Sequence, residues 1–362
     1  MSEFRILDAS NPDDRAFWLD VWSSWQEREP HAHPGYLSLF EIPGQRSLCV
    51  FFADQGGGVL FPFHIRDLGI ELWCPAEVKA SDFVSPYGYG GPYFWGTPSS
   101  GDFWANFSSW TKASRVATGF FRCSLFPEQV LPLPVGETIV MGNVVRTLNH
   151  SAETLWMDAE HKVRKNVNKA RRAGLRCFLD PDVEHLQEFL QIYRSTMARR
   201  QASDFYHFDD DFFETLAASM PGIGRYFHVS NKDGEVISSE LVLVSTDHIY
   251  SFLGGTTLEG MSLGANDLLK HGIIDWGREE GKAAFVLGGG FRPDDGIFRY
   301  KQAFAPGGMV PFMVGKWVTD QSLSDELVEA RRSWEQSQGR DWEPLDGFFP
   351  PYRAAGKPSQ TA

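Results

Sequence analysis

The chain has 362 residues, of which 42% are hydrophobic and 14% aromatic, so it can bury a substantial core and does not have a disordered composition. It carries 34 basic and 47 acidic residues, a formal net charge of −13, which excludes generic binding of nucleic acid through a broadly basic surface. The length suggests two domains or one large one.

The N-terminus, MSEFRILDASNPDD, lacks the basic start and apolar run of a signal peptide, and no apolar run approaches the length of a membrane span. The four cysteines are far apart and form no metal-ligand spacing, and His31 and His33 lie in a Pro-flanked stretch that favours a solvated loop over a metal site. We therefore expect a soluble, cytoplasmic protein with reduced thiols, no metal and no membrane span.

The first half begins with an amphipathic pattern over 13–28 that predicts a helix with Phe17, Val21, Trp22 and Trp25 on one face. Strands are expected at 47–54 and 58–67, joined by the hairpin signal QGGG, with a third at 70–75. An aromatic, Gly- and Pro-rich loop follows over 81–98, then a helix over 101–115 and a strand over 118–128. Two prolines and a change of pattern make 127–150 the expected crossing between halves.

The second half has a similar order of elements. We expect helices at 161–173, 182–200, 209–220, 266–281 and 322–338, and strands at 176–180, 224–231, 236–245, 248–256 and 283–290. Asn266 is the expected N-cap of its helix, and Gly281 the expected stop. The order predicts an α+β fold with three parts: an N-terminal domain over 1–147, a C-terminal domain over 148–320, and a C-terminal helix with a loosely ordered tail over 321–362.

The stretch HKVRKNVNKARRAGL, residues 161–175, holds six Lys or Arg residues and no acid. On a helix, Val163, Val167 and Ala170 share one face and predict an apolar anchor. A second face carries Lys165, Lys169 and Arg172, and a third carries Arg164, Asn168 and Arg171. This surface suits the phosphates of a tRNA acceptor arm or a nucleotide-linked substrate, and the alternative is a solvated helix that balances nearby acids.

Several segments together resemble the FemAB-type aminoacyltransferases of the GNAT superfamily. They are the basic helix with the segment before it, the late helix LGANDLLKHGIIDWGREEG, the end FVLGGGFRPDDGIFRYKQAFAP, and the first-half landmarks VSPYGYGGP and FRCSLFP. The resemblance covers roughly residues 35–315. It implies two tandem GNAT-like domains with a groove between them, and transfer of a tRNA-borne amino acid to an amine of a peptidoglycan precursor. Broader relatives are acyltransferases tied to envelope polysaccharide.

The resemblance also suggests site residues. Lys301 matches the lysine of the family's FK-x-x-F pattern and would touch substrate phosphate, although Tyr300 replaces the usual Phe. Arg299 alternates with it in FRYKQAF, for which an ordinary edge strand is the alternative, and the preceding glycines, with Gly289 at their centre, allow a ligand to approach the backbone closely.

No general base is obvious in the sequence. Glu240 lies mid-strand, and Asp294 and Asp295 follow the glycines, so Lys301, Glu240 and Asp295 are the candidate catalytic residues. Phe126 stands where the family has the Asp of an Asp-Pro pair.

Two further segments bear on the substrates. In CoA-using GNAT enzymes the loop before the late helix binds pyrophosphate, but here it carries Glu259 in place of a basic residue, and a carboxylate would repel pyrophosphate. In the first half, Tyr87 and Tyr89 offer stacking and hydroxyls for a sugar or peptide, or else pack within their own loop.

We therefore expect an N-acyltransferase that binds no cofactor and uses a phosphate-bearing donor, aminoacyl-tRNA in preference to acyl-CoA. The acceptor is an amine of an envelope glycan or peptide precursor. The alternatives are an acyl-CoA- or acyl-carrier-dependent N-acyltransferase of polysaccharide biosynthesis and a non-catalytic binding protein of the same fold. The sequence leaves the oligomeric state open.

Overall fold

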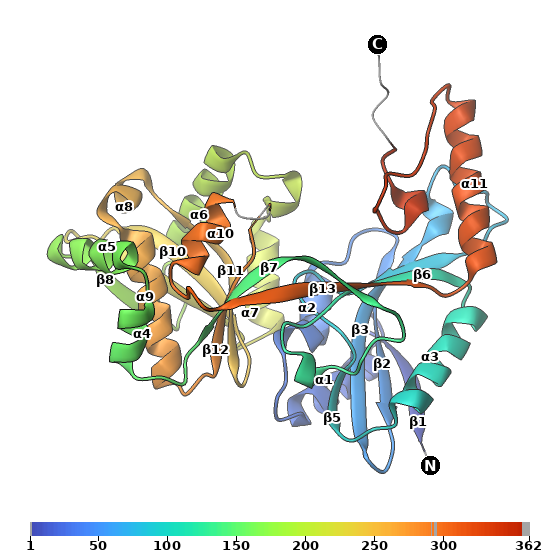
Figure 1. The fold of residues 1–362 in the computed structure, drawn as a ribbon, viewed down its shortest axis with the longest axis horizontal. Helices are drawn as coiled ribbons and strands as arrows, with labels where there is room; N and C mark the ends of the chain where they lie inside the picture. The colour runs from blue at the N-terminus through green and yellow to red at the C-terminus, as the bar shows by residue number, and fades with distance from the viewer. Residues whose placement is uncertain (1, 291, 293–294, 357–362) are drawn as a thin grey trace. The chain divides into compact units, whose positions relative to one another are not determined.

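The computed structural model describes residues 2–290, 292 and 295–356 (Figure 1). The chain divides into two compact units. Unit 1 comprises Met1–Trp25, His31–Val140 and Phe312–Ala362, and unit 2 comprises Gln26–Pro30 and Met141–Pro311. This division differs from the one drawn from the sequence in the placement of the C-terminal helix, because Leu323 and Leu327 of that helix are buried against Leu68 and Ala117 of unit 1.

Unit 1 is built on a mixed sheet. Its elements are β1 (Glu3–Asp8), α1 (Pro12–Ser24), α2 (Pro34–Leu39), β2 (Gln45–Ala53), β3 (Gly57–Asp67), β4 (Ser81–Val84), β5 (Tyr93–Gly96), α3 (Ser100–Ala113), β6 (Val116–Arg122) and α11 (Gln321–Ser337). Strands β7 (Glu137–Thr147) and β13 (Met309–Val318) each begin in one unit and end in the other. The strand order in unit 1 is β1-β2-β3-β4-β6-β13, with β5 paired to β3.

Aromatic side chains fill the core of unit 1. Phe61 of β3 stacks on Phe121 of β6 with ring centroids 5.6 Å apart, and Phe103 and Phe107 of α3 are fully buried against the same sheet. Burial of this many aromatic rings supplies much of the hydrophobic stabilisation of the unit.

Unit 2 carries the other strands of the same 13-stranded sheet. Its further elements are α4 (Ala152–Asp158), α5 (His161–Arg172), β8 (Arg176–Asp180), α6 (Leu186–Arg200), α7 (Asp210–Ser219), β9 (Gly224–Ser230), β10 (Val236–Val244), β11 (His248–Thr256), α8 (Leu258–Leu263), α9 (Ala265–Glu279), β12 (Ala284–Gly288) and α10 (Gly296–Gln302). The strand order is β7-β12-β11-β10-β9-β8.

Helices α6 and α9 cover opposite faces of the strands of unit 2. Tyr226 of β9 packs edge-on against Phe189 of α6, with ring centroids 5.0 Å apart, whereas Phe227 lies 5.2 Å from Trp276 of α9. Successive side chains of a strand point to opposite faces, so the two helices sandwich the sheet.

Both units contain one parallel strand pair within an otherwise antiparallel sheet, β4 with β6 in unit 1 and β11 with β12 in unit 2. In each case a helix, α3 or α9, precedes the second strand of the pair, as a parallel connection requires. The predicted α+β fold with two related halves is confirmed. The groove expected between them stays a prediction.

Some local predictions were wrong. Residues 70–75 form turns rather than a strand, and the expected loop over 81–98 contains β4 and β5. Helix α1 ends at Ser24, because Trp25 already has an extended backbone, and the helix buries Trp18 and Trp22. The predicted helix over 161–173 and strand over 176–180 are confirmed as α5 and β8.

Candidate functional site

The basic helix α5 is anchored as its pattern predicts. Val163, Val167 and Ala170 are buried in the core of unit 2. Lys165, Asn168, Arg171 and Arg172 lie on the remaining faces, and we call these four residues the cationic face. Helix α5 contacts α8 and α9, and Figure 1 shows it beside them.

Not every basic residue of α5 is available to a ligand. Arg164 donates through one guanidinium nitrogen to the carbonyls of Met157 and Ala159, so it fastens the end of α4. Lys169 Nζ donates to the Ser262 carbonyl at 2.5 Å, which ties α5 to α8. The prediction that Arg164 serves phosphate binding therefore competes with a structural role.

Lys301 lies on α10, a helix, so the edge strand considered for FRYKQAF is wrong. Asp295 caps this helix by accepting a hydrogen bond from the Phe298 amide at 2.7 Å. The cap places Lys301 in the last turn of the helix, where its Nζ donates to the Gly289 carbonyl at 2.7 Å.

The environment of Lys301 changes its proton affinity. Its pKa is lowered from the ordinary value to about 8, chiefly by burial and next by the positive charge of Lys270. The carboxylates of Glu240 and Asp295 oppose this shift. The structure thus brings together all three candidate catalytic residues and adds Lys270, which the sequence reasoning missed.

Lys270 and Glu240 form a buried ion pair between α9 and β10, with side-chain exposures of 9% and 6%. Ser251 of β11 completes the group, because its hydroxyl donates to Glu240 Oε1 at 2.6 Å and accepts from Lys270 Nζ at 2.8 Å. Lys270 Nζ also lies 5.1 Å from the Phe285 ring centroid. A lysine on the apolar face of a helix, beside Leu269 and Ile273, was the sequence signal for this pair.

These groups meet where two parallel strands separate, a point that we call the strand split. Pairing of β11 with β12 covers only His248–Tyr250 and Ala284–Val286. A bulge in β11 lies between Ser251 and Leu253, which face consecutive residues of β10. Gly288 then turns the chain at the end of β12 with φ of +83°, a conformation that favours glycine. Ser251 and Gly289, the partners of the two lysines, both follow the paired segments.

The start of α9 is acidic and covered. Asp267 in its first turn is buried, and burial raises its pKa to about 6. The Asn166 side chain of α5 donates to Asp267 at 3.3 Å, and Tyr300 donates to the Asn266 carbonyl at 3.2 Å.

Asn266 is not the N-cap as predicted, because α9 begins at Ala265 after Gly264. The helix ends before Gly281, which has φ of +70°, as expected for its stop.

The segment that resembles a pyrophosphate loop is itself helical. Residues Leu258–Leu263 form α8, capped by the Thr257 hydroxyl, which accepts from the Gly260 amide at 3.0 Å. Glu259 lies in the first turn of this helix. The Glu259 carboxylate in the first turn and the Thr257 hydroxyl, which already occupies the Gly260 amide, both work against a pyrophosphate at this position.

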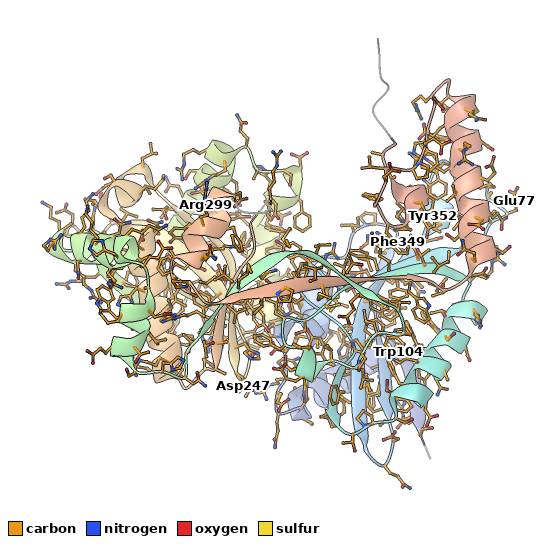
Figure 2. All side chains as sticks on the ribbon, in the orientation of Figure 1. Glu77, Trp104, Asp247, Arg299, Phe349 and Tyr352 are labelled. Atoms are coloured by element: carbon orange, nitrogen blue, oxygen red, sulfur yellow. The ribbon has the colours of Figure 1, made fainter. Side chains whose placement is uncertain are left out.

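The remaining site candidates are placed as follows. Arg299 is exposed on α10 and is labelled in Figure 2, while Asp294 lies outside the described residues. In unit 1, Tyr89 packs edge-on against His31 and Phe312, at 5.4 and 5.7 Å, and Tyr87 lies 5.2 Å from Phe40. Both rings therefore pack against residues outside the 81–98 segment, and the substrate role expected of Tyr87 and Tyr89 stays a prediction.

Within the described ranges, no group of three or more His, Cys, Asp or Glu side chains is placed to hold a metal ion. No helix in that same part of the chain combines the length and apolarity needed to cross a bilayer. Two surface hollows of about 670 Å³ each are lined by residues of unit 1, one around Arg46, Lys79 and Arg115 and one around Trp73 and Trp334.

Comparison with protein families places residues 158–302 in the family described as acetyltransferase (GNAT) domain. The matched segment runs from the end of α4 to the end of α10, so it contains the cationic face and both lysines of the strand split. Comparison with curated proteins finds no match. Residues 158–302 therefore contain a domain of the GNAT acetyltransferase type.

Solved structures extend the likeness to the whole chain. FemX matches with a TM-score of 0.64 and 11% identity over 86% of this chain and 98% of its own. The C-terminal domain of a putative lysylphosphatidylglycerol synthetase from Agrobacterium fabrum matches with a TM-score of 0.53, 12% identity, and coverage of 90% and 96%. L-PGS from Bacillus licheniformis matches with a TM-score of 0.51 and 13% identity over 87% of this chain and 94% of its own. The chain thus shares its overall fold with these proteins.

Proposed function

We propose that the protein is an N-acyltransferase that moves an aminoacyl group from aminoacyl-tRNA to an amine of a cell-envelope precursor, a peptidoglycan peptide or an amino sugar. The observation that carries the proposal is the cationic face of α5, a group of basic residues beside the acidic, covered start of α9. Phosphates of a donor are attracted to the first and repelled by the second.

The choice of tRNA over CoA follows from the same geometry. A CoA pyrophosphate bound at the start of α9 would meet Asp267 and Glu259, and the Asn166 carbonyl oxygen lies within 2.9 Å of the position that a Cβ on Gly264 would take. A polynucleotide needs no such enclosed site, because Lys and Arg side chains on an exposed helix bind its backbone phosphates. The name of the GNAT acetyltransferase family keeps acyl-CoA as the second candidate donor.

Lys301 is the proposed general base. The acceptor nitrogen attacks the ester carbonyl of the donor, a C–N bond forms, and the C–O bond to the tRNA ribose breaks. The neutral Lys301 amine takes the proton that the nitrogen loses and returns it to the leaving ribose oxygen. A lysine with a pKa of about 8 is suited to this role, because a useful fraction is neutral near physiological pH.

The test is binding of charged tRNA and of acetyl-CoA to the full chain, side by side over a salt series. Binding of tRNA that weakens linearly with the logarithm of salt concentration supports the proposal. Binding of acetyl-CoA alone moves the protein to the CoA-dependent alternative, and binding of neither favours the non-catalytic or acyl-carrier alternatives. Release of tRNA above background in the presence of an amine then separates an enzyme from a binding protein.

A further inference from the structure

We propose that Arg122 of unit 1 binds an oxyanion, a carboxylate or phosphate group of a substrate, at the point where β4 and β6 separate. Arg122 lies outside residues 158–302, the segment that matches the GNAT family. The inference rests on the proposed function in one part, which is that the acceptor is the molecule that carries the oxyanion.

Arg122 occupies the place in unit 1 that corresponds to the strand split of unit 2. The parallel pairing of β4 with β6 reaches Val84 and Phe120, and the Ser85 amide then donates to the Phe120 carbonyl at 2.9 Å. Beyond this bond the chain after β4 leaves the sheet, whereas β6 continues to Arg122 beside β13. In open α/β sheets, ligands bind beyond the carboxyl ends of the strands, and Ser85 and Arg122 lie at such ends.

Two hydrogen bonds to Ser85 hold Arg122 in place. The Arg122 amide donates to the Ser85 hydroxyl at 2.7 Å, and Nη1 of its guanidinium donates to the Ser85 carbonyl at 3.1 Å. The guanidinium carbon lies 5.3 Å from the centroid of the Phe120 ring. The segment after Ser85 is fixed in turn, because the Tyr36 hydroxyl donates to the Tyr87 carbonyl at 2.9 Å. The arginine is therefore oriented before a ligand arrives.

The charge of this half-buried arginine is not neutralised by an acid. Within the described residues the Arg122 guanidinium forms no ion pair, and its Nε and Nη2 have no hydrogen-bond partner. Arg66 differs, because its Nε donates to the fully buried Asp82 at 2.5 Å. The second oxygen of Asp82 accepts from Arg353 at 2.6 Å. A charge that is removed from water without a partner is costly, and an anion that binds Arg122 relieves this cost.

The titratable groups around Arg122 do not supply the missing negative charge. Burial lowers the pKa of Arg122, and the positive charge of Arg66 lowers it further. Burial lowers the pKa of His64 to about 4, so its ring is neutral near neutral pH. Burial also raises the pKa of Tyr36 well above its ordinary value, so this phenol is neutral as well. The planar fork of an arginine in a positive environment suits an oxyanion that accepts two hydrogen bonds.

The test follows the 15Nε–1Hε signals of the arginines in the full chain, without a donor. The protein is titrated with sodium pyrophosphate and, separately, with sodium glutarate at constant ionic strength. Arg122→Lys identifies the Arg122 signal by its loss. We expect this signal to shift and to saturate with a dissociation constant of about 10 mM or lower. The Arg66 signal is the internal control and should not move, because its Nε is bonded to Asp82.

Each outcome of the titration has a defined meaning. Saturation with pyrophosphate alone assigns a phosphate ligand, saturation with glutarate alone assigns a carboxylate, and saturation with both supports a general oxyanion site. A signal that saturates with neither ligand overturns the proposal. So does an equal shift of Arg46, an exposed arginine of β2 in the same unit, because it would show unspecific attraction of anions.

Kinetics test the role of the site in catalysis. Arg122→Gln should raise KM for an anionic acceptor by about 10-fold or more and change kcat little, as expected for uniform binding. Arg122→Lys should keep part of the affinity, because the charge remains and the fork is lost. Arg46→Gln is the matched control and should leave KM unchanged. A lower kcat with unchanged KM in Arg122→Gln would contradict the binding role, and the wild-type titration decides the matter if this variant does not fold.

The two measurements also separate this inference from the proposed function. If the Arg122 signal saturates but the protein transfers no acyl group, the oxyanion site stands and the proposed function fails. If transfer is present while the Arg122 signal ignores both ligands, the proposed function stands and this inference fails.

Discussion

Lys301 of α10 and Gly289, which follows β12, are joined by a 2.7 Å hydrogen bond from the lysine Nζ to the glycine carbonyl. The bond ties α10 to the residue that follows β12. It holds the lysine amine at the point where β11 and β12 have stopped pairing. An acyl donor that reached this split would therefore meet a lysine already oriented by the backbone.

The first prediction concerns Lys301. Replacement by Ala should lower kcat/KM for transfer by about 100-fold or more, a typical loss for a general base. Lys301→Arg should be equally impaired, because arginine keeps the charge but does not lose its proton. Steady-state transfer assays on both sides of neutral pH measure both variants, and wild-type activity should rise with pH through about 8.

Lys282→Ala is the control for Lys301. Lys282 belongs to the same unit and its Nζ likewise donates to backbone carbonyls, those of Ser245 and Thr246 at 2.8 Å. Its replacement should leave transfer unchanged. Activity retained in Lys301→Arg would make the lysine a fixed positive charge instead of a base.

The second prediction concerns the cationic face. The double change Lys165→Ala and Arg172→Ala should weaken binding of charged tRNA and reduce the slope of log K against log salt by about 0.7 to 0.9 for each phosphate that the protein no longer neutralises. Fluorescence anisotropy over a salt series measures it. Arg194→Ala with Arg200→Ala removes two exposed charges of α6 in the same unit and should have little effect. Equal slopes in both double variants would make α5 a solvated helix.

The third prediction separates Arg164 from the cationic face. Because Arg164 donates to two carbonyls at the end of α4, its replacement by Ala should lower the free energy of unfolding by about 1–3 kcal/mol. Urea unfolding measures this decrease. Affinity for tRNA should change far less than in the double variant of the cationic face, and the reverse ranking would restore Arg164 to the binding surface.

The fourth prediction follows from Asp267. Its pKa in the folded protein is about 6, above the ordinary value of 3.8, so protonation favours the fold. The stabilisation is complete below pH 3.8 and is lost as pH rises through about 6, where the buried carboxylate ionises. Asp267→Asn should therefore be more stable than the wild type at about pH 8, by up to about 3 kcal/mol, and lose this advantage near about pH 4.

Urea unfolding of both proteins at about pH 4.5 and about pH 8 checks the expected crossover. Asp211→Asn provides the comparison, since Asp211 is an exposed acid in the first turn of α7. A difference between Asp267→Asn and wild type that does not depend on pH would show that Asp267 is ionised throughout.

Periodicity and charge determined much of this protein before any coordinates. Val163, Val167 and Ala170 fix one face of α5 inward, so its basic residues had to face outward. The glycines before FRYKQAF marked the end of a buried strand, and β12 ends at Gly288. These features are local, because hydrophobic spacing and glycine conformation act within a few residues.

Only the tertiary structure decided which side chains meet. Lys270, Glu240 and Ser251 are separated by 11 to 30 positions and come from three elements, so no local pattern joins them. In the sequence Arg164 looks like the other basic residues of α5. Only the fold brings it beside the end of α4. Residues 70–75 had strand propensity, but tertiary packing placed them in turns. Sequence sets which faces are apolar or charged, whereas the packing of those faces decides which charges are buried, paired and able to shift each other's proton affinity.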